Sequence, residues 1–468
     1  MKRTCIGLLL LMTVLCGAAT AEVSFDFICV GYAWDITPDG TVVVGNAAGT
    51  YETFRWTALD GVELLGGSTA AMGSGAGTPD VSADGAHASA TIADVATDST
   101  YITQGLWTQG ERWTETMPPT PPDGGTMDGA YGSAWGLSDD ASTLVGLYWR
   151  PGQPDGSAHA SYWTEETGVV DLGSSGRNSR ANDADYDGNV IVGWDENPDW
   201  GGWRPTVWVD GVMTVLESPE GFCLLYAVTP DGGMVIGNSY NEDRRFAEAA
   251  KWEWTGSTWD KHVLGSLPGT FADYGNVQPH DVTADGSMIV GSNGFDWTQY
   301  AAFIWTEETG MVNLDDFLVD NGVTLPPMFD IQSLTAISDD GTVMVGFGQD
   351  TYYPWGPRSF IIDTNATGIE DVADVGAPKL HMSAFPNPAC GGTTLSFSLA
   401  SRENVRLSVY DITGRLVAEI DAGSMDAGRH GIPWDGRDGS GADVASGIYL
   451  CRLDAGGQHT TEKVTVLR

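Results

Sequence analysis

Residues 37–45 read TPDGTVVVG, an Asp-Gly turn followed by a run of mainly β-branched residues. The same turn and strand return six times: SADGAHASA from Ser82, SDDASTLVG from Ser138, DYDGNVIVG from Asp185, TPDGGMVIG from Thr229, TADGSMIVG from Thr283 and SDDGTVMVG from Ser338. Their spacing of roughly 44 to 55 residues is close to the length of a propeller blade. We therefore expect a repeat architecture.

The pattern inside each repeat predicts antiparallel strands. In the first repeat, residues 33–36 form a short strand, Pro38-Asp39-Gly40 form a turn, and residues 41–44 return as a second strand. An Asp-Gly pair between two apolar runs is a strong hairpin signal. Residues 54–57 and 62–65 supply two more strands. Because one such sheet cannot bury both faces alone, we expect an all-β, seven-bladed β-propeller over residues 22–363.

One tryptophan marks the third strand in six of the seven repeats. The residues at this position are Trp56, Trp107, Trp163, Trp208, Trp252 and Trp305, with Ile362 in the seventh repeat. A large aromatic residue at the same point of each sheet buries most area between neighbouring sheets. We interpret these residues as packing residues.

The seventh repeat lacks a fourth strand, because the pattern ends at residues 359–363. Residues 23–30 precede the first strand of the first repeat and belong to no other unit. We expect this leftover segment to supply the missing strand and to close the ring.

The repeats resemble the HAF-type extracellular repeat, whose pattern is roughly A-x-x-I-S-x-D-G-x-x-V-V-G, then A-F-x-W-T, then L-G. Residues 31–363 carry the resemblance. The second repeat departs from it, with no second-strand glycine and with Met117-Pro118-Pro119 in place of the Leu-Gly ending. The resemblance implies secretion and a β-rich repeat fold, while the molecular role of that family is largely undefined.

A second domain follows the repeats. Residues 364–380, TNATGIEDVADVGAPKL, have lost the repeat and are typical of a linker. Residues 381–468 then alternate strongly between apolar and polar positions, with about seven short strands. This pattern predicts a small immunoglobulin-like sandwich. Its Cys390 and Cys451 either pair in an oxidising compartment or stay as buried thiols.

Four elements of this domain are similar to the FlgD-like immunoglobulin domain and to the type A C-terminal sorting domain of type IX secretion. They are Pro386-Asn387-Pro388, Tyr410-Asp411-x-x-Gly414-Arg415, Trp434-Asp435-Gly436-Arg437-Asp438 and Gly447-Ile448-Tyr449. The resemblance implies recognition by a secretion machinery and passage through a Gram-negative outer membrane. The alternative is a stalk that stays on the mature protein.

The N-terminus and the charge agree with export. Residues 1–21 hold two cations, an apolar run and a small-x-small site, which is typical of a cleaved signal peptide. No later apolar run is long enough for a transmembrane segment. The net charge of -41 disfavours nucleic acid and anionic membranes as partners, since both are bound chiefly through cations. We expect a protein that is secreted or held on the outer surface of a Gram-negative-type bacterium.

The candidate ligand-binding residues are aromatic side chains in the loops opposite the Asp-Gly turns. They are Trp149, Trp194, Trp200, Trp203, Tyr240, Trp297, Tyr300, Tyr352, Tyr353 and Trp355. Aromatic rings among acidic and amide groups suit sugar rings or extended peptides. The alternative is that these rings pack loops onto one another.

Catalysis has little support. The seven histidines fall outside any recognisable Ser/His or metal-binding motif. Three functions stay open. The first is non-catalytic binding of an extracellular glycan or protein, and the second is a polysaccharide hydrolase or lyase that uses acidic residues on the same face. The third is a structural role in a surface layer.

One candidate metal site contains Asp183, Asp185 and Asp187 in the pattern D-x-D-x-D-G. Alternate oxygens before a glycine turn can wrap calcium. However, the twelfth loop position is Trp194 rather than a bidentate glutamate, and the repeat turn already accounts for Asp187. We expect no cofactor other than this possible calcium ion.

Overall fold

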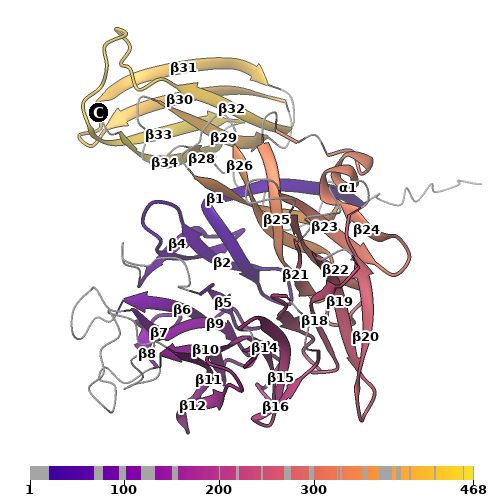
Figure 1. Ribbon diagram of the computed structural model, residues 1–468. Helices are drawn as coiled ribbons and strands as arrows, with labels where there is room; N and C mark the ends of the chain where they lie inside the picture. Colours follow the sequence, from indigo (N-terminus) through magenta and orange to yellow (C-terminus); the bar gives the residue numbers. More distant parts are fainter. Residues whose placement is uncertain are drawn as a thin grey trace, which may run out of the picture. The chain divides into compact units, whose positions relative to one another are not determined.

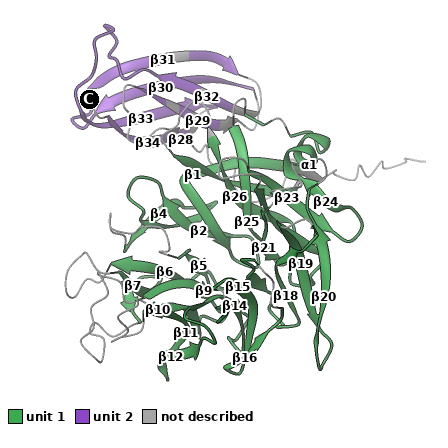
Figure 2. Ribbon diagram, viewed as in Figure 1, with its two compact units in different colours: residues 1–368 green, residues 369–468 purple. Residues whose placement is uncertain are grey.

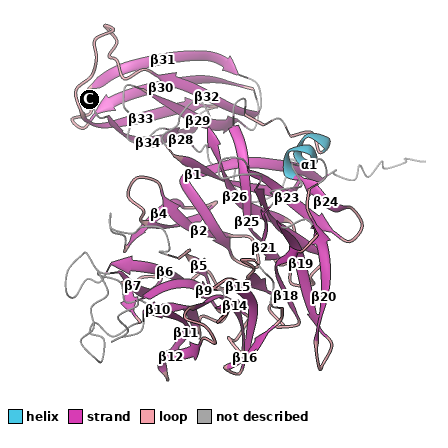
Figure 3. Ribbon diagram, viewed as in Figure 1, coloured by secondary structure: helices cyan, strands magenta, loops and turns pink. Residues whose placement is uncertain are grey.

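The computed structural model describes residues 21–67, 77–93, 102–116, 132–149, 157–199, 201–217, 221–243, 246–267, 276–294, 300–323, 325–326, 329–350, 356–367, 382–385, 392–399, 402–425, 428–456 and 458–466. The chain divides into two compact units, residues 1–368 and 369–468 (Figure 2). Strands dominate both units (Figure 3), and the described residues contain one helix, α1 (Leu314–Asp320).

The first unit is a β-propeller of seven antiparallel blades (Figure 1). Blade one comprises the second half of β1 (Ala21–Ile36), β2 (Val42–Ala47), β3 (Thr53–Thr57) and β4 (Gly61–Gly66). Blade two comprises β5 (Asp80–Val81), β6 (His87–Ala93), β7 (Ile102–Thr108) and β8 (Thr114–Glu115). Blade three comprises β9 (Gly132–Leu137), β10 (Leu144–Trp149), β11 (Ala158–Thr164) and β12 (Gly168–Gly173).

The remaining four blades follow in chain order. Blade four comprises β13 (Ser179–Ala184), β14 (Val190–Glu196), β15 (Trp203–Val209) and β16 (Val212–Val215). Blade five comprises β17 (Leu225–Val228), β18 (Met234–Asn241), β19 (Phe246–Trp254) and β20 (Trp259–Gly265). Blade six comprises β21 (Asn276–Val282), β22 (Met288–Gly294), β23 (Tyr300–Thr306) and β24 (Gly310–Asn313). Blade seven comprises β25 (Phe329–Ile337), β26 (Val343–Asp350), β27 (Pro357–Thr367) and the first half of β1.

Strand β1 closes the ring, as the sequence predicts. Its first half pairs with β27, where Phe25 lies opposite Ile362, and its second half pairs with β2 in blade one. The first strands of the seven blades contact one another in order, from β1 through β25 and back to β1. One boundary differs from the prediction: β27 continues to Thr367, four residues into the expected linker, because β1 extends far enough to pair with it.

The third-strand aromatic residues pack between blades, which confirms their predicted role. Trp208 of blade four is fully buried in a cluster with Val145 and Ala160 of blade three. Its indole Nε1–H donates to the carbonyl oxygen of Leu172, also in blade three, at 3.2 Å. Trp252 is buried in the same way between blades five and four.

In six of the seven blades, the glycine that ends the second-strand motif allows the innermost strand to bulge. A Cβ at Gly193 would lie 2.0 Å from the carbonyl oxygen of Arg180, and a Cβ at Gly291 would lie 2.2 Å from that of Gln278. Opposite these glycines the inner strands carry an extra residue, Asn182 in β13 and His280 in β21. Such bulges re-aim side chains. In the blades that have this glycine, the bulge therefore sets the direction of the extra side chain of the inner strand.

The second unit is a two-sheet sandwich. One sheet contains β28 (Met382–Phe385), β29 (Thr393–Leu399) and β32 (Gly428–Trp434), and the other contains β30 (Glu403–Asp411), β31 (Leu416–Met425), β33 (Gly447–Ala455) and β34 (Gln458–Val466). Both sheets contribute to a single apolar core. The predicted immunoglobulin-like sandwich is confirmed. Cys451 is buried in this core, whereas Cys390 lies outside the described residues, so their pairing stays an open prediction.

Candidate functional site

A cavity of about 770 Å³ lies along the axis of the propeller, and we call it the axial cavity. First strands from all seven blades line it, together with Tyr51 of the β2–β3 loop. Tyr51 is 49% exposed, so the cavity reaches the surface on the side of the ring opposite the Asp-Gly turns. This size is within the usual range for a small-molecule site.

The bulged residues of the inner strands point toward this cavity. In six blades the extra residue of the bulge lines it: Trp34, Trp135, Asn182, Tyr226, His280 and Thr335. Blade two has Ala90 in place of the second-strand glycine, no bulge in its two-residue β5, and Pro79 at the lining position. The repeat therefore presents one variable side chain per blade to a common space.

Hydrogen bonds and ring contacts fix several of these side chains. The Trp34 Nε1–H donates to Asn46 Oδ1 at 3.0 Å, and the Trp34 ring stacks on Tyr32 with 5.5 Å between the ring centroids. His280 Nε2 is 3.0 Å from Ser292 Oγ, and burial lowers the pKa of His280 to about 4. His280 is therefore neutral near pH 7. The cavity wall combines ordered aromatic rings with amide and imidazole groups.

Four half-buried aspartates join neighbouring blades beside the bulges. Each accepts a backbone N–H from the next blade: Val81 N–H to Asp35 at 2.8 Å, Leu137 N–H to Asp80 at 2.9 Å, Val228 N–H to Asp183 at 2.9 Å and Ile337 N–H to Asp281 at 2.7 Å. Gly136, Ala227 and Ala336 occupy this position in the other three blades. The aspartates thus act as inter-blade clamps that also line the cavity.

Crowding of these carboxyl groups favours their protonated forms. Burial, together with the nearby Asp35, raises the pKa of Asp281 to about 8. Burial also raises the pKa of Asp80 well above its usual range, and its carboxyl group is hydrogen-bonded to that of Asp35, so the pair holds a proton between them. The axial cavity therefore carries less negative charge near pH 7 than its composition indicates.

We expect the propeller to lose stability as pH rises from about 4 to about 8. The clamps have raised pKa values in the folded state, so the folded chain binds more protons than the unfolded chain in this window. Thermal unfolding followed by circular dichroism at several pH values checks this, with 0.5 M NaCl as a control for surface repulsion. Asp281→Asn should flatten the slope above pH 6, whereas Asp285→Asn, in the exposed turn of the same blade, should not. A melting temperature that stays flat or rises with pH would contradict the prediction.

On the other side of the ring, the Asp-Gly turns form a partial circle of backbone hydrogen bonds. Ala83 N–H donates to Asp139 O at 2.8 Å, Ala284 N–H to Asp339 O at 3.2 Å and Asp339 N–H to Pro38 O at 2.9 Å. Pro38 and Pro230 have no N–H, so neither can continue the circle to the next blade. Asp139 and Asp339 line the cavity at this end, and burial raises the pKa of Asp139 to about 6.

Arg180 is the one lysine or arginine among the described residues that line the axial cavity. Its guanidinium carbon lies 3.6 Å from the centroid of the Trp135 ring, and its Nε–H donates to Asn182 Oδ1 at 2.6 Å. Burial lowers the pKa of Arg180 to about 10, so it stays charged near pH 7.

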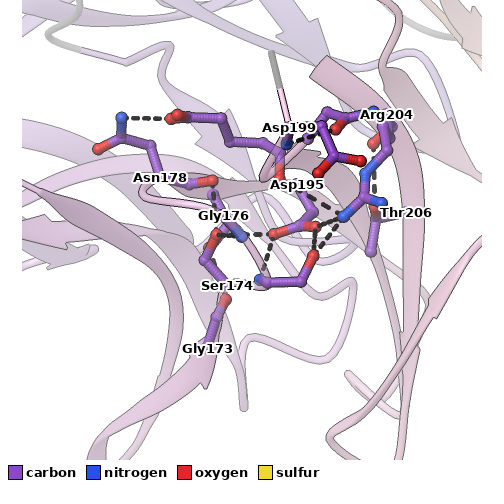
Figure 4. A network of polar contacts seen from close by, with 12 residues as sticks. Gly173, Ser174, Gly176, Asn178, Asp195, Asp199, Arg204 and Thr206 are labelled. Carbon is purple, nitrogen blue, oxygen red and sulfur yellow. Dashed lines mark hydrogen bonds and ion pairs between the residues drawn. The ribbon is translucent and has the colours of Figure 1, made fainter. Parts of the chain in front are cut away.

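A polar network holds the start of β13, one residue before Arg180 (Figure 4). Fully buried Asp195 accepts from Ser174 Oγ at 2.7 Å and from Ser175 N–H at 2.9 Å, and it forms an ion pair with Arg204. Asn178 Nδ2 donates to Glu196 at 2.6 Å. The β12–β13 loop is therefore tied to blade four at the point where that blade begins.

The predicted ligand-binding aromatic residues have mixed outcomes. Trp200, Trp297, Tyr352, Tyr353 and Trp355 lie outside the described residues. Trp194 is 7% exposed and stacks on Trp203 with 4.6 Å between the ring centroids. Trp203 in turn contacts Phe222, which is 61% exposed and was not among the predicted residues.

The other three described aromatic residues also lie at strand ends of this face. Tyr240 packs against the backbone of Gly221, where a Cβ would lie 2.6 Å from the ring, and Tyr300 packs in the same way against Gly294. Trp149 is half-buried at the end of β10. None of the five described residues lines the axial cavity. For Trp194, Tyr240 and Tyr300 the contacts agree with the packing alternative.

The structure does not gather Asp183, Asp185 and Asp187 into a metal site. No group of three or more His, Cys, Asp or Glu among the described residues is placed to hold a metal ion. Asp183 is an inter-blade clamp, and Asp185 replaces the Ser or Thr of the other turns, accepting the Val190 N–H at 2.9 Å. Calcium binding here stays a prediction that the described contacts do not support.

The sequence also held a signal for the axial residues. They stand three positions before the Ser, Thr or Asp that opens each turn motif, where the seven repeats read Trp, Pro, Trp, Asn, Tyr, His and Thr. The position that follows is more restricted, because it holds only Asp, Gly or Ala. A variable position that lies opposite the second-strand glycine in six of the seven repeats would have indicated residues that line a common cavity.

Comparisons with known proteins agree with both units. Residues 387–458 match the model of the FlgD Ig-like domain. No curated protein sequence matches the chain. No helix in the described part of the chain is long and apolar enough to cross a bilayer.

Several solved structures are similar to this chain. The β-propeller domain of the Trilobed protease from Pyrococcus furiosus is 12% identical, with a TM-score of 0.46 over 74% of this chain and 100% of that one. An oligogalacturonate lyase from Vibrio parahaemolyticus is 12% identical, with a TM-score of 0.46 over 74% of this chain and 98% of that one. A putative TolB from Agrobacterium tumefaciens is 15% identical, with a TM-score of 0.36 over 53% of this chain and 91% of that one. The chain is thus a β-propeller followed by a FlgD Ig-like domain.

Proposed function

We propose that the propeller is a non-catalytic binding domain that takes an extracellular glycan into the axial cavity. The observation that carries this proposal is the set of variable, polar and aromatic side chains that the bulges direct to one cavity open to the surface. A regular scaffold with one variable residue per blade suits recognition, because the backbone stays constant while the chemistry of the wall changes.

The chemistry of the wall favours a carbohydrate. Rings of Trp34 and Tyr226 offer flat apolar surfaces, and the amides of Asn46 and Gln278 offer both donors and acceptors. Sugars need this combination, since each ring has an apolar face and a rim of hydroxyl groups.

The carboxyl groups of Asp35 and Asp80 do not have the geometry of a glycosidase pair. Glycosidases keep their two carboxyl groups at least about 5 Å apart. Asp35 and Asp80 are in hydrogen-bond contact, and each also accepts a backbone N–H, so neither is free to act on a substrate. Release of product from polysaccharide would favour the hydrolase or lyase alternative.

We further propose that the C-terminal unit directs export or surface attachment. Its FlgD Ig-like sandwich at the end of the chain supports this proposal. Deleting residues 369–468 in a host with type IX secretion should retain the protein inside the cell, and normal export of the deletion would exclude a sorting role. A protein that binds no ligand yet assembles on the surface would favour the surface-layer alternative.

We expect Trp34→Ala to weaken glycan binding by at least about tenfold, the usual loss for a buried aromatic anchor. The test titrates the full chain with a polysaccharide and oligosaccharide panel, follows tryptophan fluorescence, and assays each mixture for released sugar. Trp254→Ala is the matched control, because Trp254 is 47% exposed on the outer part of blade five. Saturable binding by wild type and by the control, but not by the variant, would support the site. Equal binding by both variants would place the ligand elsewhere.

A further inference from the structure

Arg180 is a cation that has no acidic partner among the described residues. The described residues give it one hydrogen bond, to Asn182, and ring contacts with Trp135 and Trp194, but no ion pair. This is unexpected in a chain with 63 acidic and 22 basic residues. Burial of an unpaired charge is costly unless a partner arrives.

Asp183 and Asp281 also line the axial cavity, but their side chains are committed to the backbone. The two oxygens of Asp183 accept the N–H groups of Ala184 at 2.7 Å and Val228 at 2.9 Å. Those of Asp281 accept from Val282 and Ile337, both at 2.7 Å. Arg180 lines the same cavity, and the hydrogen bond that it makes to the described residues uses its Nε–H rather than its terminal nitrogens.

The surroundings of Arg180 hold it in one orientation. Its flat face lies on the Trp135 ring at 3.6 Å, and Asn182 Oδ1 accepts its Nε–H. Asn182 is itself fixed, because its Nδ2 donates to the carbonyl oxygen of Leu225 in blade five at 2.6 Å. When a guanidinium is held by its flat face and its Nε, its two terminal nitrogens remain. These nitrogens can donate two parallel hydrogen bonds to one carboxylate.

We propose that Arg180 binds the carboxylate of an acidic sugar, so that the ligand is an oligosaccharide with a single uronic acid unit. This inference rests on the proposed function. The charge of the protein limits the ligand to few carboxylates, because a surface with a net charge of -41 repels polyanions. Rings and amides beside Arg180 favour a sugar over the C-terminal carboxylate of a peptide.

The test is isothermal titration of the full chain with a glucuronosyl xylobiose and with its methyl ester, which differ in charge at one group. We expect the acid to bind at least tenfold more tightly than the ester. Arg180→Gln should remove this difference, because it should lower the affinity for the acid and leave the affinity for the ester unchanged. Arg177→Gln is the matched control, since Arg177 lies exposed in the preceding loop and lines no part of the cavity.

Each outcome is informative. Equal affinity for acid and ester would overturn the role of Arg180 while leaving glycan binding intact. If neither sugar binds while other glycans do, the ligand class is wrong, and if no glycan binds, the proposed function fails as well. Tighter binding of a tripeptide with a free C-terminal carboxylate would also overturn the inference. Should Arg180→Gln not fold, Arg180→Lys keeps the charge and should still lose most of the preference for the acid.

Discussion

Trp208→Ala is expected to lower the free energy of unfolding of the propeller by about 3–5 kcal/mol, the usual range for a fully buried tryptophan. Trp208 has no exposed surface and fills the space between blades three and four. Removing it leaves a cavity and also leaves the Leu172 carbonyl oxygen without the indole donor. Because each blade contacts only its two neighbours, this loss cannot be made up elsewhere.

Chemical denaturation followed by circular dichroism measures the change, and Trp254→Ala serves as the matched control. Trp254 is 47% exposed and packs at its edge against Trp259, so its loss should cost no more than about 1 kcal/mol. If the two variants were equally stable, the packing of blades against one another would not be the main source of stability.

Deleting residues 22–30 is expected to abolish cooperative folding of the propeller at 37 °C or to lower its melting temperature by more than about 10 °C. The deletion removes the part of β1 that completes blade seven. It also removes Phe25, which stacks on Phe360 at 5.0 Å, and Phe27, which contacts Phe329 at 4.9 Å. Both rings are partly buried against the core of blade seven, so their loss adds to the loss of the strand pairing.

Calorimetry of the deletion, compared with a chain lacking residues 369–468, separates ring closure from general truncation. The second deletion removes a separate compact unit, so the transition of the propeller should persist nearly unchanged. An unaltered transition after loss of residues 22–30 would mean that the ring is held without β1.

Much of the fold could be predicted because its signals are local. The Asp-Gly turns, the β-branched runs and the third-strand tryptophans each act within a few residues, and their repetition multiplies the evidence. Ring closure followed from simple counting, since one repeat lacked a strand and one segment was left over. The exact ends of β1 and β27 were not predictable, because pairing between residues over 300 positions apart decides them.

The candidate site was harder to predict for a physical reason. Loop aromatic residues such as Trp194 looked available in the sequence, yet the structure buries Trp194 against Trp203. The axial residues, Trp34 and Arg180 among them, stand inside strands, where alternation alone does not indicate which side chain faces the axis. A bulge opposite a glycine changes that direction, and only the assembled ring brings the residues of seven blades together.

The environments of the axial aspartates were also not predictable from the sequence. Asp35 and Asp80 are 45 positions apart in the chain, yet their carboxyl groups share a hydrogen bond in the folded ring. Asp183 looked like a metal ligand from its spacing, but its partners are backbone N–H groups of its own blade and the next. The spacing of residues along the chain predicts local turns. It does not predict the environment of each carboxyl group, because that environment depends on the blades beside it.

The central claim is that ligand occupies the axial cavity, and a crystal structure of the full chain with a bound oligosaccharide from the binding panel tests it most directly. The account predicts sugar density along the axis, in contact with Trp34 and Arg180. Sugar bound to the outer strands or to the loop aromatic residues, with the axial cavity holding only water, would contradict it.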